Sequence, residues 1–459
     1  MLSGRCFTVI RSFDLVVLGV GMAAVSAAEK CAAAGWSVAV VDELPYGGTC
    51  ALRGCDPKKL LRRGAEIIND AQLMRGKGIE DGGLRINWPE LVAFKRSFTD
   101  RMPDRIEDGL ESKGVATFHG QARFLNENTV EIGGHTRLQG RNVLIATGAE
   151  PRPLAMLGAE HVIDNAAFME LDDLPPRILF VGGGYISFEF AHIAARAGSR
   201  VCVVEHGGRP LKGFDPDLVD RLVAHGRRLG VEVRLYTALE SIERLEGGLR
   251  VRAKSNGLIE ELTVDLVVHG AGRIPAIDRL DLAAAAIERT DEGILVDAHL
   301  RSVSNPAVYA AGDAADTPGA ALTPVAVFEG KVAASNMLKG DHAEPDYRGV
   351  PSVVFTIPEL ARVGMMEAEA RAAGHEVRVI SNDTSEWFSN FRVGETCGHT
   401  KIIVDARTDE ILGAHLLGPG YAEIVNHFGL AIRLGLMAGD LKKMVSAYPT
   451  IGSDLGSML

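Results

Sequence analysis

The chain has 459 residues, of which 46% are hydrophobic and 24% are charged, and it carries a formal net charge of −11. This length corresponds to about three domains of roughly 150 residues each. The acidic balance disfavours nucleic acid as a partner, because such sites need a basic surface. No apolar run reaches the ~18 residues that would cross a bilayer, so we expect neither nucleic acid nor membrane as a partner.

The first residues, MLSGRCFTVIRSF, contain neither a long apolar core nor a small-residue cleavage site, so we do not expect a secretory signal there. Six cysteines scattered over the chain do not make the dense disulfide framework of an extracellular protein. We therefore expect a reducing compartment, the cytoplasm, where a disulfide is more often catalytic than structural.

The first predicted unit is DLVVLGVGMAAVSAAEKCAAAGWSVAVVD. Its pattern predicts a buried strand at 14–18, a glycine turn, a helix at about 22–34 and a second strand at 36–41. The turn contains Gly19 and Gly21, and Ala24 stands where a dinucleotide fingerprint has its third glycine.

The same pattern returns in RILFVGGGYISFEFAHIAARAGSRVCVVE, where the corresponding residues are Gly182, Gly184 and Ser187. In both units the first glycine lies 23 residues before an acid, which is Asp42 in the first and Glu205 in the second. Two units with equal spacing predict two related strand–turn–helix structures.

These residue types suit a dinucleotide. The first glycine permits a tight turn, the second lets the backbone approach a pyrophosphate, and a small third residue lets helix and strand pack closely. The free N–H groups of the helix N-terminus attract the pyrophosphate, and the acid accepts hydrogen bonds from a ribose diol. The chain is therefore predicted to hold two dinucleotides.

The segment GGTCALRGCDPKK, at 47–59, contains Cys50 and Cys55. A zinc site, a structural disulfide and a redox pair are three open interpretations. Zinc usually needs a companion pair of ligands, and a disulfide across so short a loop constrains the unfolded chain little. We expect no metal site, because the other cysteines stand alone in the sequence: Cys6, Cys31, Cys202 and Cys397.

The rest of the chain alternates helices and strands. Polar helical segments are predicted at about 56–75 and 89–113, followed by strands within 116–125, 128–132 and 142–148, and by a proline-containing linker at 151–158.

With the glycine units and the cysteine segment, the sequence resembles the flavin-dependent pyridine nucleotide–disulfide oxidoreductases. This is the group of glutathione reductase, dihydrolipoamide dehydrogenase and mercuric reductase. Further matching motifs are ATG at 146–148, GRIP at 272–275, AAGD at 310–313, LTPVAVFEG at 322–330, FTIPELARVG at 355–364 and ILGAHLLGPGYAEI at 411–424.

The resemblance implies an α/β fold with two Rossmann-like dinucleotide-binding domains and a C-terminal α+β dimerisation domain. The implied domains are a first FAD-binding part at 14–150, an NAD(P)-binding domain at 151–272, a return to the FAD domain at 273–342, and a dimerisation domain at 343–459. It also implies a homodimer in which each active site borrows residues from the partner's C-terminal block.

By the same resemblance, Cys55 is the thiol beside the flavin and Cys50 is the outer thiol that meets the acceptor. A thiolate is the working nucleophile, so nearby positive charge should lower its pKa. Lys58 matches the family lysine near the flavin, and Glu189 matches the glutamate that pairs with it. Tyr448 is the remaining catalytic candidate.

The resemblance further assigns cofactor contacts. Asp42 matches the adenosine ribose contact of FAD, Asp313 matches its ribityl contact, and Tyr185 matches a ring that covers the nicotinamide pocket. The other expected cofactor-binding residues are Gly19, Gly21, Ala24, Gly48, Thr49, Lys59, Ala122, Thr147, Gly148, Gly182, Gly184, Ile186, Glu205, Gly272, Arg273 and Thr323.

The acid Glu205 favours NAD(H) over NADP(H), because a 2′-phosphate at that place would meet like charge. Arg209, four residues later, could offset this charge.

The C-terminus departs from the family. Thiol-reducing relatives carry His-Pro-Thr followed by Glu, a couple that moves the substrate thiol's proton. Here Tyr448 stands for the histidine and Ser453 for the glutamate. Glu29 stands where glutathione reductases carry an arginine, which disfavours glutathione, and the C-terminal cysteine pair of mercuric reductases is missing.

The leading hypothesis is an NAD(P)H-dependent flavoprotein that reduces a small disulfide or another thiol-reactive acceptor through Cys50 and Cys55. A second hypothesis has the flavin act directly on a quinone, a metal ion or another nicotinamide. A third is a redox sensor whose lost His–Glu couple marks lost turnover.

Overall fold

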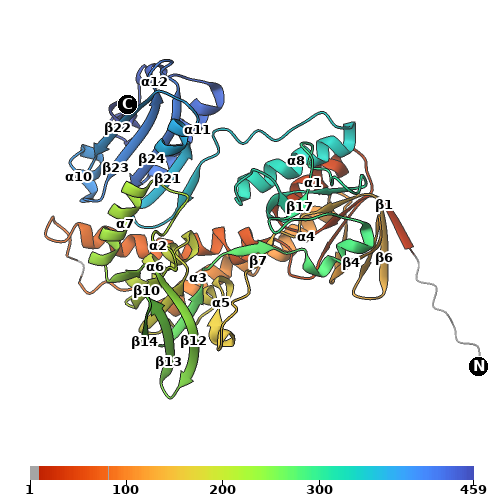
Figure 1. The fold of residues 1–459 in the computed structure, drawn as a ribbon, viewed down its shortest axis with the longest axis horizontal. Coiled ribbons are helices and arrows are strands. Elements are labelled where there is room, and N and C mark those ends of the chain that lie inside the picture. Colours follow the sequence, from red (N-terminus) through yellow and green to blue (C-terminus); the bar gives the residue numbers. More distant parts are fainter. Residues whose placement is uncertain (1–9, 81) are drawn as a thin grey trace, which may run out of the picture. The chain divides into compact units, whose positions relative to one another are not determined.

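The computed structural model describes residues 10–80 and 82–459, and Cys6 lies outside them. Within them the chain forms two compact units (Figure 1). Unit 1 comprises residues up to 59 together with 94–152 and 273–347, and unit 2 comprises residues 60–93, 153–272 and 348–459.

Unit 1 contains a seven-stranded sheet in the order β3-β2-β1-β6-β5-β4, with β18 paired to β6. Strands β1, β2, β3, β6 and β18 pair in parallel, whereas β4 and β5 form antiparallel pairs. The bounds are β1 Ile10–Leu18, β2 Val38–Asp42, β3 Ala116–His119, β4 Ala122–Asn126, β5 Thr129–Ile132, β6 Thr136–Ile145 and β18 Val308–Ala310.

Two helices of unit 1, α1 (Met22–Ala33) and α8 (Thr323–Lys339), pack closely against each other. A Cβ atom added to Gly330 would lie 2.3 Å from the carbonyl oxygen of Ala23, so this contact requires a glycine. The smaller elements of unit 1 are α4 Met102–Glu111, β7 Ala149–Pro151, β16 Arg273–Pro275, η3 Asp278–Leu280, η4 Leu282–Ala285, β17 Ile294–Leu295, η5 Gly312–Ala314 and β19 Ala315–Asp316.

The structure alters two sequence predictions. Strand β1 begins at Ile10 rather than at residue 14, because residues 10–13 pair with β6. The single helix predicted at 89–113 is wrong: α3 (Trp88–Thr99) ends before Asp100 and α4 starts at Met102. Pro103 suits the first turn of a new helix but not the interior of a long one, because proline lacks the N–H that an interior position donates.

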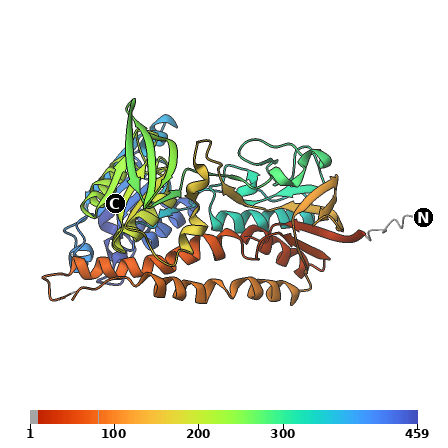
Figure 2. The same cartoon turned by 90° about the horizontal axis from the view of Figure 1, so that it is seen from below.

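Unit 2 contains a parallel sheet in the order β11-β10-β9-β15-β8. A separate antiparallel sheet, β12-β13-β14, extends away from it in both views (Figures 1 and 2). The bounds are β8 Val162–Ile163, β9 Arg177–Val181, β10 Arg200–Val204, β11 Val231–Arg234, β12 Thr237–Leu245, β13 Gly248–Ser255, β14 Leu258–Val264 and β15 Leu266–His269, with helices η2 Ala159–His161, α5 Asn165–Met169, α6 Tyr185–Arg196 and α7 Pro216–Arg228.

The C-terminal part of unit 2 is an antiparallel sheet in the order β20-β21-β24-β23-β22 with α11 packed on it (Figure 1). Every residue of β23 and β24 is buried. The bounds are β20 Ser352–Val354, β21 Glu359–Gly364, α9 Glu367–Ala372, β22 Val377–Asp383, α10 Phe388–Val393, β23 His399–Asp405, β24 Ile411–Gly418, α11 Tyr421–Leu434, α12 Ala438–Lys442, η6 Ile451–Asp454 and α13 Leu455–Met458.

The predicted α/β architecture is confirmed: two sheets with parallel strands each carry a glycine turn, and the C-terminal part is an α+β domain. Across the described residues, no helix has both the length and the apolar character that crossing a membrane requires.

Candidate active site

The first glycine turn connects β1 to α1 in unit 1. Gly19 has a φ of +94°, and an added Cβ would lie 2.4 Å from the carbonyl oxygen of Ala146. Gly21 precedes α1 without any side-chain cap, and an added Cβ there would meet nothing within 4 Å among the described residues. The turn is therefore closed on one side by protein and open at the helix N-terminus, which suits an anion.

Asp42 ends β2 and faces this turn. Its carboxylate accepts hydrogen bonds from the main-chain N–H of Val20 at 2.8 Å and of Leu44 at 2.9 Å. Burial raises the pKa of Asp42, and these two hydrogen bonds act in the opposite direction. The carboxylate is thus held in place beside the glycine turn by main-chain donors.

The cysteine segment lies directly on the first glycine turn. Gly48 has a φ of +61°, and a Cβ added to it would lie only 2.7 Å from the Cα of Gly21. The N–H of Gly47 donates to the carbonyl of Val20 at 3.0 Å. Cys50 follows within a short π-helix, η1 (Thr49–Arg53), and a long helix, α2 (Cys55–Leu73), starts at Cys55.

Cys50 and Cys55 are free thiols whose side chains hydrogen-bond to each other. The hydrogen bond from Cys50, with help from Thr323 and the charges of Lys59 and Lys58, lowers the pKa of Cys55 to about 6 although burial opposes this. The same hydrogen bond, together with burial, raises the pKa of Cys50. Cys55 is therefore the thiolate of the pair at neutral pH, and Cys50 keeps the proton.

Thr323, the first residue of α8, places its hydroxyl 3.6 Å from the Cys55 sulfur. Arg273 contacts the start of η1, where it donates to the Thr49 hydroxyl at 3.4 Å and also to the carbonyl of Ala149. Unit 1 thus brings together three segments that are far apart in the sequence around the cysteine pair.

Asp313 lies in η5, next to the start of α8. Burial raises its pKa, and the positive charge of Arg273 opposes this rise. The turn before it is held by Glu329, which the sequence analysis missed: its buried carboxylate accepts from the N–H of Gly312 at 2.7 Å and from the Tyr347 hydroxyl at 2.6 Å. The available signal was an acidic residue within the apolar helix segment VAVFEGKVAA.

The second glycine turn, in unit 2, repeats the first. Gly182 has a φ of +95°, and an added Cβ would lie 2.6 Å from the Cα of Ala271. Gly184 precedes α6 and has no side-chain cap within the described chain. Ser187 is fully buried, and its hydroxyl would lie 2.1 Å from a Cβ on Gly270, so a small side chain is required at the third position.

Glu205 directly follows β10, whereas Asp42 is the last residue of β2. The Glu205 carboxylate accepts from the N–H groups of Gly183 and Gly207, each at 2.7 Å, and only 6% of the residue is exposed. His206 Nδ1 lies 3.2 Å and Lys212 Nζ 3.9 Å from the same carboxylate oxygen.

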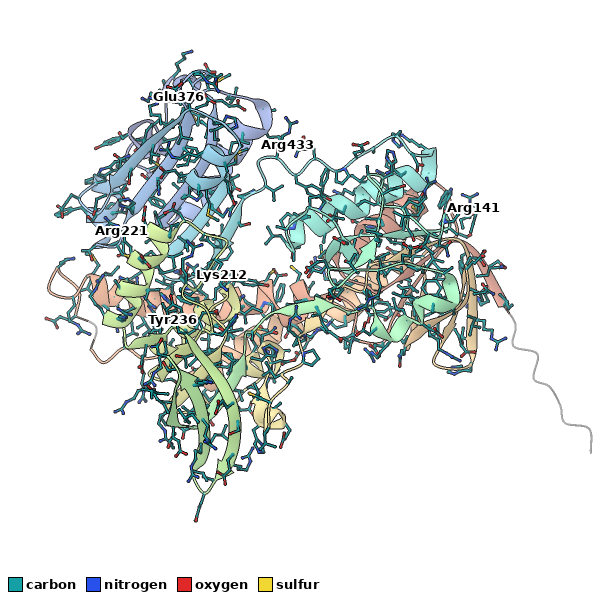
Figure 3. All side chains as sticks on the ribbon, viewed as in Figure 1. Arg141, Lys212, Arg221, Tyr236, Glu376 and Arg433 are labelled. Carbon is teal, nitrogen blue, oxygen red and sulfur yellow. The ribbon has the colours of Figure 1, made fainter. Side chains whose placement is uncertain are left out.

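Exposed side chains flank this carboxylate. Figure 3 labels Lys212 on the loop that follows β10 and Tyr236 just after β11, both in unit 2. The Tyr236 hydroxyl would lie 2.3 Å from a Cβ on Gly208, so the ring lies against this loop. Tyr185, which is 45% exposed, begins α6.

The remaining predicted residues have the following positions. Lys58 is 6% exposed in unit 1, and Glu189 is 2% exposed in unit 2, where it accepts from the N–H of Phe355 at 3.1 Å. Tyr448 is 79% exposed, and Ser453 bonds locally to Thr450. Ala24 and Ile186 lie in the first turns of α1 and α6, Lys59 in α2 and Ala122 at the start of β4. Thr147 and Gly148 lie between β6 and β7, and Gly272 precedes β16.

Within the described residues, no group of three or more His, Cys, Asp or Glu side chains has the arrangement of a metal site. Of the isolated cysteines, Cys31 and Cys397 are buried and Cys202 is half-buried. Burial raises the pKa of all three to about 12, so they stay as neutral thiols.

Two family models match the chain. Residues 13–330 match the pyridine nucleotide-disulphide oxidoreductase model, and residues 350–458 match the dimerisation domain of the same family.

Curated relatives cover nearly the whole chain. It is 32% identical to a glutathione reductase of Burkholderia cepacia, over 96% of this chain and 97% of the relative. It is 31% identical to a dihydrolipoyl dehydrogenase of Staphylococcus aureus, over 96% of this chain and 94% of the relative. It is 30% identical to a mercuric reductase of Bacillus cereus, over 96% of this chain and 70% of the relative.

A solved structure is also similar. The Cu(II) complex of the HOCl-induced flavoprotein disulfide reductase RclA from Escherichia coli superposes with a TM-score of 0.87 at 27% identity, covering 98% of this chain and 99% of that one. The family models, these relatives and the paired glycine turns agree with the resemblance found in the sequence. The chain belongs to the pyridine nucleotide-disulphide oxidoreductases and is an NAD(P)H-dependent flavoprotein oxidoreductase.

Proposed function

We propose that this enzyme passes electrons from a nicotinamide dinucleotide through FAD to Cys50 and Cys55, and from them to a small disulfide or another thiol-reactive acceptor. The observation that carries the proposal is the position of the pair: Cys50 and Cys55 follow Gly48, whose added Cβ would lie 2.7 Å from the Cα of Gly21 in the first glycine turn, and α2 starts at Cys55. The lowered pKa of Cys55 supports it, because the thiolate is the reactive form of a cysteine.

FAD is expected for the family, and the residues of unit 1 fit it. Space is open at Gly21, above an uncapped helix N-terminus, and Thr147 has a buried hydroxyl with no partner among the described residues. In the proposal Asp42 binds the adenosine ribose, Asp313 binds the ribityl chain, and the first glycine turn binds the pyrophosphate. Bound FAD would relay two electrons between the nicotinamide and the cysteine pair.

We assign the second glycine turn to the nicotinamide dinucleotide and favour NAD(H). A buried carboxylate on Glu205 would repel a 2′-phosphate, and main-chain N–H groups hold it in place. Lys212 and His206 beside it reduce this preference. Tyr185, at the N-terminus of α6, would cover the nicotinamide, and by the family resemblance Lys58 would act near the flavin.

The acceptor reaction follows from the pair itself. As a thiolate, Cys50 attacks one sulfur of the acceptor disulfide, and the first acceptor thiolate leaves. Cys55 then attacks the sulfur of Cys50, which closes the Cys50–Cys55 disulfide and releases the second acceptor thiolate. In the proposal Tyr448 comes from the partner subunit of a homodimer, which the dimerisation domain supports.

We propose the domain boundaries 14–150 and 273–342 for FAD, 151–272 for the nicotinamide dinucleotide, and 343–459 for dimerisation. We also propose a reducing compartment such as the cytoplasm, because six scattered cysteines do not make a dense disulfide framework.

A second candidate function is reduction of a metal ion. The similar RclA structure is a Cu(II) complex, and a thiolate such as that of Cys55 is a soft ligand for copper. In this reaction the metal ion would be a substrate rather than a resident cofactor.

Anaerobic titration of the yellow protein with NADH, and separately with NADPH, tests the proposal. A long-wavelength absorbance band at two-electron reduction is expected in the wild type, since the Cys55 thiolate would lie beside the flavin. The Cys50→Ser variant should lose disulfide reduction. Retained turnover of Cu(II) by this variant would favour direct reduction by the flavin. A protein that NADH reduces but that turns over no acceptor would be a sensor.

A further inference from the structure

Tyr236 lies beside the second glycine turn and has no role in the function proposed above. It is the second residue after β11, the strand that pairs with β10. Its main-chain N–H donates to the carbonyl oxygen of Gly207 at 3.0 Å, and the N–H of Gly207 donates to the Glu205 carboxylate at 2.7 Å. Gly207 therefore joins the main chain of Tyr236 to the acid that would bind the ribose of the dinucleotide.

The ring of Tyr236 lies on Gly208, the next residue of the same loop. A Cβ added to Gly208 would lie 2.3 Å from the tyrosine hydroxyl oxygen and 2.6 Å from Cζ. The φ of Gly208 lies outside the left-handed region, so the ring rather than the backbone requires a glycine here. Tyr236 is nevertheless 60% exposed. The loop therefore supports one part of the ring and leaves the rest open to a ligand.

The backbone of Tyr236 is strained. Its φ of +51° lies in the left-handed region, where a bulky residue is uncommon and carries a steric cost. Asn256, whose N–H donates to the Tyr236 carbonyl at 3.4 Å, has a similar φ of +48°, but asparagine tolerates this region. Burial of the ring does not offset the cost, because the side chain lies outside the core. Strain of this kind clusters at ligand-binding sites, so it indicates a role in binding.

An adenine ring suits this position. In a dinucleotide the adenine is bonded directly to the ribose that Glu205 would bind, so it lies within one sugar ring of that carboxylate. A flat base binds well against an aromatic side chain, and such stacking does not depend on hydrogen bonds to the base. Lys212, whose Nζ lies 3.9 Å from the same carboxylate, carries a charge that suits a phosphate instead.

We propose that the exposed face of Tyr236 stacks on the adenine of the nicotinamide dinucleotide. The inference rests on the proposed function, since it concerns the nucleotide that we assign to the second glycine turn. The contact adds affinity for the adenine, which NADH and NADPH share. It does not involve the nicotinamide ring, so the rate of hydride transfer in the bound state is independent of it.

Stacking differs measurably from a purely structural role, in which the tyrosine only keeps Glu205 in position through the loop. Loss of that support would change the contact with the 2′ position of the ribose, where NADH and NADPH differ. Loss of stacking would weaken both nucleotides by the same factor, because both carry adenine. The ratio of the two affinities therefore separates the two roles.

The test compares Tyr236→Phe, which keeps the ring, with Tyr236→Asn, which removes it but tolerates the left-handed backbone. Tyr236→Gly is a second variant without the ring, because glycine adopts this conformation freely. Leu258→Ala is the matched control, since Leu258 is an exposed apolar residue of the same unit. Rapid mixing of the oxidised holoenzyme with NADH or NADPH gives the half-saturating concentration and the limiting rate of flavin reduction.

Two further ligands complete the test. Reduced nicotinamide mononucleotide lacks the adenosine half, so its rate of flavin reduction reports the nicotinamide site alone. Adenosine diphosphate ribose lacks the nicotinamide, and its dissociation constant, measured by calorimetry, is independent of any electron transfer.

Tyr236→Asn and Tyr236→Gly should raise the half-saturating concentrations of NADH and NADPH by about tenfold each. The dissociation constant of adenosine diphosphate ribose should rise by the same factor. The limiting rate of flavin reduction and the rate with reduced nicotinamide mononucleotide should not change. Tyr236→Phe and Leu258→Ala should match the wild type.

Three results would overturn the inference: unchanged affinities in the variants without the ring, an equal loss with reduced nicotinamide mononucleotide, or a shifted ratio of NADH to NADPH affinity. The last of these would show that Tyr236 only supports Glu205. A wild type whose flavin neither NADH nor NADPH reduces would instead refute the proposed function. Binding of adenosine diphosphate ribose would still test the stacking contact in that case.

Discussion

Gly48 contacts Gly21 so closely that a Cβ on Gly48 would lie 2.7 Å from the Gly21 Cα. The cysteine segment and the first glycine turn therefore form one structure, although 27 residues separate these two glycines in the sequence. In the proposed function this contact fixes the distance between the cysteine pair and the pyrophosphate-binding turn.

The first prediction concerns this contact. Gly48→Ala should lower both stability and the flavin content of the purified protein, because alanine in this glycine-only backbone region (φ +61°, ψ −159°) costs roughly 1–3 kcal/mol and its Cβ would also push the cysteine segment off the turn. Gly114→Ala is the control, since Gly114 has a φ of +78° with open space around its Cβ position. The measurements are the flavin-to-protein absorbance ratio and the free energy of unfolding. Equal effects in the two variants would contradict the role of the contact.

The second prediction concerns the pH dependence of Cys55. Because its pKa is lowered to about 6, the thiolate should persist at neutral pH and become protonated as the pH falls through about 6. The long-wavelength band of the NADH-reduced protein should lose half its intensity there. Lys59→Gln removes a positive charge that lowers this pKa, so it should move the midpoint upward by roughly half a pH unit.

Lys339→Gln is the control for this titration, because Lys339 lies at the far end of α8. Its midpoint should match that of the wild type. A midpoint near the ordinary cysteine value in the wild type would show that Cys55 is not the stabilised thiolate.

The two glycine turns could be predicted because their signal is local. Strand, turn, helix and acid lie within one short stretch of sequence, and both acids were placed at the ends of the correct strands. The structure adds that Asp42 accepts the N–H of Val20 and Glu205 that of Gly183, the residue between the two glycines in each unit.

Contacts across long sequence separations could not be predicted from local patterns. Thr323 and Cys55 are 268 residues apart, and no periodicity places their side chains 3.6 Å from each other. The antiparallel sheet β12-β13-β14 was also missed as a separate sheet, because β14 is mostly exposed and lacks an alternating apolar face. The break between α3 and α4 was missed because the apolar pattern continues across it, although Pro103 indicated a helix start.

The third prediction concerns the choice of nucleotide. Glu205→Val should weaken NADH binding and strengthen NADPH binding, and the ratio of the two dissociation constants should shift by about tenfold or more. The reason is that the variant removes a carboxylate that would repel a 2′-phosphate and leaves Lys212 nearby. Lys212→Gln should shift the ratio the opposite way. Binding can be measured by quenching of the intrinsic fluorescence, and an unchanged ratio in both variants would refute the assignment of this turn.

The last prediction concerns Lys401, a lysine of β23 that is 7% exposed. Its ammonium lies 3.1 Å from Asp215, 2.9 Å from Asp217 and 3.3 Å from Glu367. Burial opposes the charge, but the hydrogen bonds to these aspartates outweigh it and raise the pKa of Lys401. Because Asp215 caps the N-terminus of α7, the cluster fixes the start of that helix against the C-terminal sheet within unit 2.

Lys401→Met should therefore lower the free energy of unfolding by about 3–5 kcal/mol, because it leaves the buried carboxylate of Asp215 without a counter-charge. Lys443→Met, which breaks the exposed pair with Asp440, should cost less than about 1 kcal/mol. Adding Asp215→Asn to Lys401→Met should recover part of the loss, because it removes the unpaired charge while an amide oxygen can still cap α7. Urea denaturation of these three variants and of Asp215→Asn alone measures this. Asp215→Asn can lower the free energy of unfolding as much in the Lys401→Met background as it does in the wild type. In that case the two side chains are not coupled, and the cluster does not stabilise α7.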